Sequence, residues 1–80
     1  MTERYPFVIK DLHTTPLGSE RIRRNLELEY SVDPVNHCRS LILENSAMVE
    51  RIGKNWYVKT GNVRITVNAY SNTIITAHKV

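Results

Sequence analysis

Two kinds of hydrophobic spacing divide the chain near Asn45. Before it, apolar residues recur every three or four positions, which predicts amphipathic helices, and after it they alternate with polar residues, which predicts β-strands. We therefore expect residues 1–80 to form one domain with a helical half, 1–45, and a sheet half, 46–80. The predicted fold class is α+β, with two or three N-terminal helices packed on one face of a four-stranded antiparallel β-meander.

Two helices are indicated by start signals that precede apolar residues at helical spacing. Thr15-Pro16 puts a capping residue before a proline at the first helical position, and this helix is expected to reach about Leu28. Asp33-Pro34 repeats the signal for a helix that ends near Glu44. The side chains expected to point inward are Leu17, Ile22, Leu26, Val35, Cys38, Leu41 and Ile42. Residues 5–12 fit a short helix or an extended arm, and both remain open.

Four strands are predicted at 47–52, 55–60, 63–69 and 73–79. Short hairpin signals separate them, at Gly53-Lys54, Gly61-Asn62 and Ser71-Asn72. A two-residue loop at Gly61-Asn62 pairs Thr60 with Val63, and strand alternation then assigns the other side chains to two faces. The apolar face, which the helices should cover, carries Trp56, Val58, Val63, Ile65 and Val67. The open face carries Tyr57, Lys59, Arg64, Thr66, Asn68 and Tyr70.

The register of the last strand decides which way its histidine points. A loop of 70–72 turns Thr76 and His78 onto the open face, whereas a loop of 71–72 turns both toward the helices. We favour the first register because it keeps an ionisable ring out of the core. The neighbours expected in that register are Thr66 for Thr76 and Arg64 for His78, with Ile75 and Ala77 on the apolar face.

The charge is distributed unevenly. The 80 residues contain 11 Lys and Arg against 8 Asp and Glu, and the sheet half holds five of the basic residues but only one acidic residue, Glu50. A basic sheet suits an anionic partner such as RNA or another nucleic acid. The segment 1–6 lacks the apolar run of a signal peptide, and the single Cys38 excludes an internal disulfide. We expect a cytoplasmic protein with no membrane attachment.

Several chemistries are excluded by missing residue types. Paired-metal nucleases need several carboxylates, and the sheet half offers only Glu50. His37 and Cys38 point about 100° apart on a helix, which does not suit zinc. Cys38 lies on the inward stripe and is interpreted as a buried, inert thiol. The chain has no glycine-rich phosphate loop, and we expect neither a metal nor a cofactor.

The open face carries the residue types that metal-independent RNA cleavage needs. Such cleavage requires a base for the 2′-hydroxyl, an acid for the leaving oxygen and cations around the phosphorane. His78 is the candidate acid or base, Tyr57 a proton donor or orienting group, and Arg64 a phosphate ligand. The candidate nucleic-acid-binding residues are Arg51, Lys54, Lys59, Thr66, Asn68 and Tyr70, in which the tyrosine offers a ring for stacking on bases.

Three blocks, His13–Gly18, Gly53–Val58 and Ile65–Lys79, together resemble the bacterial domain-of-unknown-function family 3781, which has no established activity. More distantly, the predicted helices, meander and last strand resemble the barnase-like and RelE-like superfamily of metal-independent ribonucleases. That resemblance implies an active face with Thr73, Thr76 and His78 on the last strand and Tyr57, Lys59 and Arg64 on its neighbours. The chain departs from the superfamily because no carboxylate is expected on the open face, and from the family because Asn72 stands where an aromatic residue is expected.

Three functions of different classes follow. The first is an endoribonuclease, toxin-like or belonging to a phage-conflict system, that uses His78 and the basic face. The second is a nucleic-acid-binding domain that uses the same surface without catalysis. The third is a protein-interaction module, either an inhibitor from a mobile element or a subunit of a homodimer, that uses the sheet face or an exposed edge strand.

Overall fold

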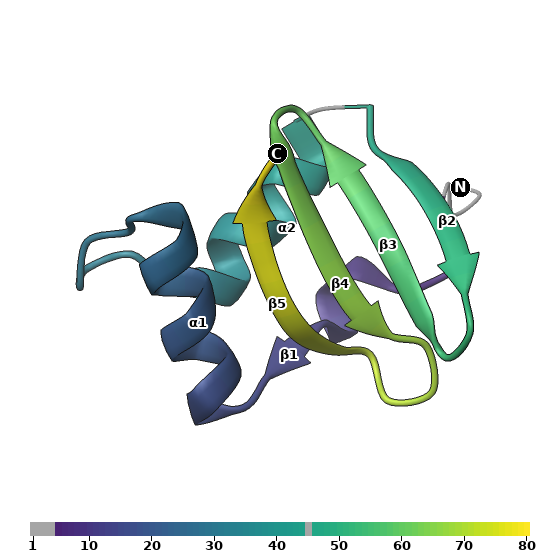
Figure 1. Cartoon of the computed structure of the whole chain (residues 1–80), viewed down its shortest axis with the longest axis horizontal. Helices are drawn as coiled ribbons and strands as arrows, with labels where there is room; N and C mark the ends of the chain where they lie inside the picture. Colours follow the sequence, from purple (N-terminus) through teal and green to yellow (C-terminus); the bar gives the residue numbers. More distant parts are fainter. Residues whose placement is uncertain (1–4, 45) are drawn as a thin grey trace.

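The computed structural model describes residues 5–44 and 46–80, so parts of the predicted helical half, 1–4 and 45, lie outside the described residues. The fold is α+β, with two α-helices and a five-stranded mixed sheet (Figure 1). The elements are η1 (Ile9–Asp11), β1 (His13–Thr14), α1 (Pro16–Leu26), α2 (Pro34–Glu44), β2 (Met48–Ile52), β3 (Asn55–Thr60), β4 (Val63–Asn68) and β5 (Thr73–Lys79).

The sheet differs from the prediction by one strand. Its order is β1-β5-β4-β3-β2, in which β2 to β5 form the expected antiparallel meander and β1 adds to β5 in parallel. The pairing joins His13 to Thr73 and Thr14 to Ile74, far apart in the sequence. The prediction of four antiparallel strands was wrong on this point because a two-residue strand is too short to show alternation.

Two of the three predicted hairpin loops, Gly53-Lys54 and Gly61-Asn62, form with two residues, whereas the third connection spans residues 69–72. Gly53 and Gly61 have φ of 61° and 60° and occupy the first loop position, as in a type II′ turn. The β3–β4 register confirms the predicted pairing from Thr60↔Val63 to Trp56↔Val67. The turn chemistry therefore determines which side chains share a face over these two strands.

The helices begin at the predicted caps. The Thr15 hydroxyl accepts a hydrogen bond from the Gly18 amide at 3.0 Å, and the Asp33 carboxylate accepts one from the Asn36 amide at 2.9 Å. Helix α1 ends at Leu26, earlier than predicted, because Glu27 adopts a left-handed conformation with φ of 56°.

The N-terminal segment 5–12 is an arm with one short 3₁₀ turn, not an α-helix. Arg39 of α2 fastens it. The guanidinium donates to the carbonyls of Ile9, Lys10 and Leu12 at 3.2, 3.1 and 2.7 Å. These bonds tie three backbone carbonyls of the arm to α2, and the arm packs on the core beside that helix.

The core lies between the sheet and the layer formed by the arm and the helices, with α1 beside β5 (Figure 1). Its fully buried side chains include Ile22, Cys38, Ile42, Val58 and Ile65. Leu17, predicted to point inward, is 57% exposed. Gly18 is the buried residue of that first turn. A Cβ on it would run into the Thr14 hydroxyl and lie 3.2 Å from the Ile74 carbonyl, so only glycine lets α1 come this close to β1 and β5.

Strand β5 contains a bulge that explains its adjacent isoleucines. Thr76 pairs with Thr66, His78 with Arg64 and Ala77 with Ile65, as in the favoured register, but Val67 then pairs with Ile74 and leaves Ile75 unpaired. Ile74 is fully buried and Ile75 is half-buried. The prediction that Ile75 points into the core was therefore wrong. The bulge adds one residue to the strand, and Ile74 takes the core-facing position in place of Ile75.

Candidate functional site

The open face of the sheet presents two rows of side chains that run across the strands. One row, from β2 to β5, is Met48, Lys59, Arg64 and His78, and the next is Glu50, Tyr57, Thr66 and Thr76. Directly paired side chains have Cβ atoms about 4.5–5.5 Å apart. Neighbouring members of each row are therefore close enough to contact a common ligand.

The strand register brings His78 to the open face beside Arg64, as predicted. Its ring is half-buried, so part of it contacts solvent. Arg64 lies over the Tyr57 ring, with 4.9 Å between the guanidinium carbon and the ring centroid. This cation–π contact holds the guanidinium on the open face, against the tyrosine ring.

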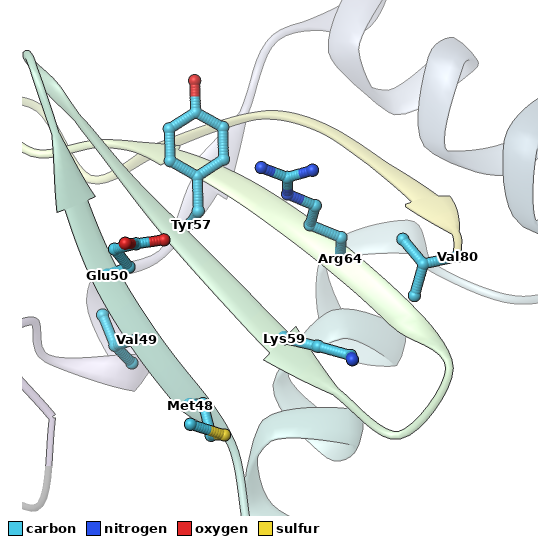
Figure 2. A pocket seen from close by; sticks show the side chains of 7 residues that line it. All are labelled: Met48, Val49, Glu50, Tyr57, Lys59, Arg64 and Val80. Carbon is cyan, nitrogen blue, oxygen red and sulfur yellow. The ribbon is translucent and has the colours of Figure 1, made fainter.

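A hollow of about 650 Å³ opens on this face (Figure 2). It is lined by Met48, Val49, Glu50, Tyr57, Lys59, Arg64 and Val80. Figure 2 shows that charged groups from β2, β3 and β4 surround it, with the Arg64 guanidinium directed toward Tyr57. His78 is not part of the lining and lies next to it, across from Arg64. The hollow combines a cationic side with an apolar end formed by Met48 and Val80.

Glu50 is the residue that sequence reasoning missed. It was expected to be absent from the open face, but it pairs with Tyr57 and lines the hollow. The Gly53-Lys54 loop held the necessary signal, because a two-residue hairpin pairs Ile52 with Asn55 and so places Glu50 opposite Tyr57. The carboxylate contributes a negative charge close to Lys59 and Arg64.

The same parity removes Arg51 from the predicted basic face, and the turn after β4 removes Tyr70. Arg51 pairs with Trp56, whose partner Val67 belongs to the core, so the Arg51 side chain lies on the helix-covered side. Its guanidinium lies 5.0 Å from the Trp56 ring centroid and 5.4 Å from that of Tyr70, which stands in the turn after β4. The predicted binding residues therefore divide between two sides of the sheet.

The four remaining candidates are Asn68, Thr66, Thr76 and Lys54, and two of them, Asn68 and Thr76, make structural hydrogen bonds. The Asn68 side-chain oxygen accepts hydrogen bonds from the amides of Tyr70 and Ser71, at 2.9 and 3.2 Å, and so shapes the β4–β5 turn. Thr66 is only 7% exposed, and the Thr76 hydroxyl accepts a 3.3 Å bond from the Asn25 amide. Lys54 is exposed in the β2–β3 hairpin.

The block that opens with His13 has a structural function. The His13 Nδ1 donates to the Asp11 carbonyl at 3.0 Å, so in the neutral ring Nε2 accepts from the Thr73 hydroxyl at 3.1 Å. The Thr14 hydroxyl donates to the Ile74 carbonyl at 2.6 Å. These bonds join β1 to β5. The hydroxyl of Thr73, which the ribonuclease resemblance had put on the active face, takes part in this joining.

Cys38 is fully buried, and burial raises the pKa of its thiol from the ordinary value of 9.0 to about 12, with a smaller contribution from the Asp33 carboxylate. The thiol is protonated at neutral pH and does not act as a nucleophile. Within residues 5–44 and 46–80, no three His, Cys, Asp or Glu side chains form a group able to hold a metal ion. Over the same residues, no helix has the length and apolar character to span a membrane.

Comparison with known proteins identifies the family. The sequence model of the family described as "Protein of unknown function (DUF3781)" matches residues 7–78. The chain belongs to this family. No curated protein and no solved structure matches it, so the resemblance to the barnase-like and RelE-like superfamily has no support from these comparisons. The DUF3781 chain must be interpreted from its own geometry.

Proposed function

We propose that this DUF3781 protein is a metal-independent endoribonuclease that acts on the open face. The observation that supports this function is the row formed by Lys59, Arg64 and His78 across three adjacent strands. A phosphodiester over this row meets two cations and one imidazole. Tyr57, on the next row, adds a hydroxyl on the ring that the Arg64 guanidinium lies against.

The reaction would be an internal transesterification. The His78 imidazole accepts the 2′-hydroxyl proton while the 2′-oxygen attacks phosphorus, and Arg64 and Lys59 neutralise the charge that develops on the phosphorane oxygens. The bond to the 5′-oxygen then breaks, and the Tyr57 hydroxyl gives that oxygen its proton. The products are a 2′,3′-cyclic phosphate and a 5′-hydroxyl. Water or buffer returns the transferred proton to Tyr57.

Strand spacing favours Tyr57 over Glu50 as the partner of His78. Adjacent strands lie about 4.8 Å apart, so β2 is displaced from β5 by about 14 Å and β3 by about 10 Å. Glu50 is therefore too distant to share one phosphodiester with His78, and its charge would repel the phosphate. Tyr57 lies one strand closer, and a tyrosine hydroxyl can donate a hydrogen bond to the leaving oxygen.

Cleavage of a fluorescent RNA in excess EDTA tests this function. The wild-type protein should cut it, and the fragments should carry cyclic phosphate ends. His78→Ala and Tyr57→Phe should each lower kcat/KM by about a hundredfold or more. His37→Ala is the matched control, because His37 lies on α2 and should cleave like the wild type. Intact RNA at micromolar protein, or undiminished cleavage by His78→Ala, would exclude the catalytic mechanism.

Binding without cleavage would instead support a nucleic-acid-binding domain on the same surface. That outcome requires affinity that falls as salt rises, because cations that contact phosphates release counterions. It also requires that the Lys59→Gln/Arg64→Gln double variant loses most of that affinity.

A protein-interaction role would use β2, which forms one of the two edges of the sheet. Its Met48 and Ile52 side chains are 75% and 51% exposed, which is unusual for apolar residues on an edge. Sizing chromatography separates this role from the first two. A dimer that persists in the Lys59→Gln/Arg64→Gln variant and disappears in Met48→Lys would favour it.

A further inference from the structure

A second cluster of aromatic and basic side chains lies at one end of the sheet. Arg51, Trp56 and Tyr70 form this end cluster. The Arg51 guanidinium lies against both rings, its Nη2 donates to the Tyr70 hydroxyl at 3.4 Å, and its Nε donates to the Gly53 carbonyl at 2.7 Å. The cation is held in place by the rings and the backbone together.

In the end cluster, the ring of Tyr70 is exposed to solvent, and hydrogen bonds hold the backbone of its turn in place. Tyr70 is 78% exposed. Its amide and that of Ser71 are bonded to the Asn68 side chain, and the Ala69 amide donates to the Lys54 carbonyl at 2.9 Å, which joins the two turns. An ordered ring with most of its surface in water is suited to accept a flat partner.

The end cluster and the hollow lie on opposite sides of the sheet, and the end of the sheet separates them. Glu50 and Arg51 are consecutive, as are Trp56 and Tyr57, so each pair sends one side chain to the open face and one to the other side. In Figure 1, the β2–β3 hairpin and the β4–β5 turn lie together at the same end of the sheet. Lys54 is exposed in that hairpin, between the two sites.

We propose that Tyr70 is a stacking platform for an unpaired base, and that the substrate is therefore single-stranded. This inference rests on the nucleic-acid substrate proposed above. A strand that leaves the hollow passes Lys54 and turns around the end of the sheet, where a base stacks on Tyr70. A duplex is too stiff for this path, because its persistence length is about 150 base pairs, whereas a single strand bends freely. Arg51 is the positioning residue that holds the ring.

Fluorescence anisotropy with uncleavable DNA probes tests this inference without interference from cleavage. The probes are a labelled single-stranded oligodeoxynucleotide, the same strand with abasic positions, and a duplex of the same sequence. The wild-type protein should bind the single strand more tightly than the duplex. Tyr70→Ala should weaken single-strand binding by about tenfold and leave binding of the abasic strand unchanged. Tyr70→Phe should retain the affinity, because it keeps the ring.

Tyr30→Ala is the matched control. Tyr30 is 93% exposed and lies 5.3 Å from the Arg23 guanidinium, but it stands in the loop between α1 and α2. This variant should bind all probes like the wild type. Unchanged single-strand binding by Tyr70→Ala, or an equal loss on the abasic strand, would overturn the stacking platform.

The catalytic proposal and the stacking proposal can be overturned independently of each other. If the protein does not cut RNA but binds the single strand through Tyr70 in a base-dependent way, the stacking platform is supported and the catalytic proposal is overturned. If cleavage depends on His78 but Tyr70→Ala binds every probe with the affinity of the wild type, the catalytic proposal is supported and the stacking platform is overturned. A protein that binds none of the probes overturns the platform.

Discussion

Gly18 and Cys38 show how single residues are constrained by what surrounds them. Glycine is a poor helix former by about 1 kcal/mol, yet Gly18 stands in the first turn of α1, because a Cβ there would collide with Thr14 and approach Ile74. The thiol of Cys38 has its pKa raised to about 12 because the side chain is fully buried. In both cases the neighbours, not the local sequence, explain the residue.

Burial of Cys38 predicts a loss of stability in alkali. The folded thiol has a pKa of about 12 and the unfolded thiol one near 9.0, so above the lower value the unfolded chain releases a proton that the folded chain keeps. The free energy of unfolding therefore falls as the pH rises through this window. The Cys38→Ala variant lacks this effect.

Above about pH 9, the free energy of unfolding of the wild type should therefore fall relative to that of Cys38→Ala, by about 1.4 kcal/mol per pH unit. Urea unfolding at about pH 8 and about pH 10 measures it. An equal difference at both pH values would show that the thiol ionises similarly in both states.

The elements of the sheet show how strand register positions side chains. The β3–β4 hairpin follows from a two-residue loop, whereas β5 departs from simple alternation at its bulge. The bulge lets Ile74 face the core at one end of the strand while His78 faces the open side at the other. Without the extra residue, one of these two side chains would point the wrong way.

The adjacent isoleucines of β5 provide an internal comparison. Ile74→Ala should lower the free energy of unfolding by about 2–5 kcal/mol because it leaves a cavity in the core. Ile75→Ala removes the same atoms from a half-buried position and should cost clearly less. Chemical denaturation followed by circular dichroism compares them, and equal costs would contradict the bulge.

At the scale of the molecule, some charged groups of residues 5–44 and 46–80 support the fold, whereas others line the hollow. Arg23 donates to the carbonyls of Glu29 and Val32, Arg39 fastens the arm, and Lys79 lies 3.4 Å from the Glu27 carboxylate. Lys59 and Arg64 line the hollow instead. The net charge of +3 therefore says less about binding than the positions of two cations.

If the proposed RNA binding holds, the positions of these cations predict which of them determine its salt dependence. The Lys59→Gln/Arg64→Gln variant should reduce the slope of log affinity against log salt by about 1.4, because each phosphate contact on a single strand contributes about 0.7. The Arg21→Gln/Lys79→Gln variant removes the same charge from α1 and from the helix side of β5, and it should leave the slope close to that of the wild type. Equal slopes in the two double variants would show that net charge alone drives binding.

The sequence by itself determined the α+β class, both helix starts and the β3–β4 register, because caps, two-residue loops and alternation act over a few residues. For His78 it left two registers open, and the structure has the pairing of the favoured one. Only the tertiary structure decided that β1 pairs with β5, that Ile74 and not Ile75 enters the core, and that Tyr70 joins Arg51 and Trp56. The pairing of His13 with Thr73 and the packing of α1 on Gly18 depend on segments distant in the sequence. Such contacts leave no periodic signal, because they arise only once the chain has folded.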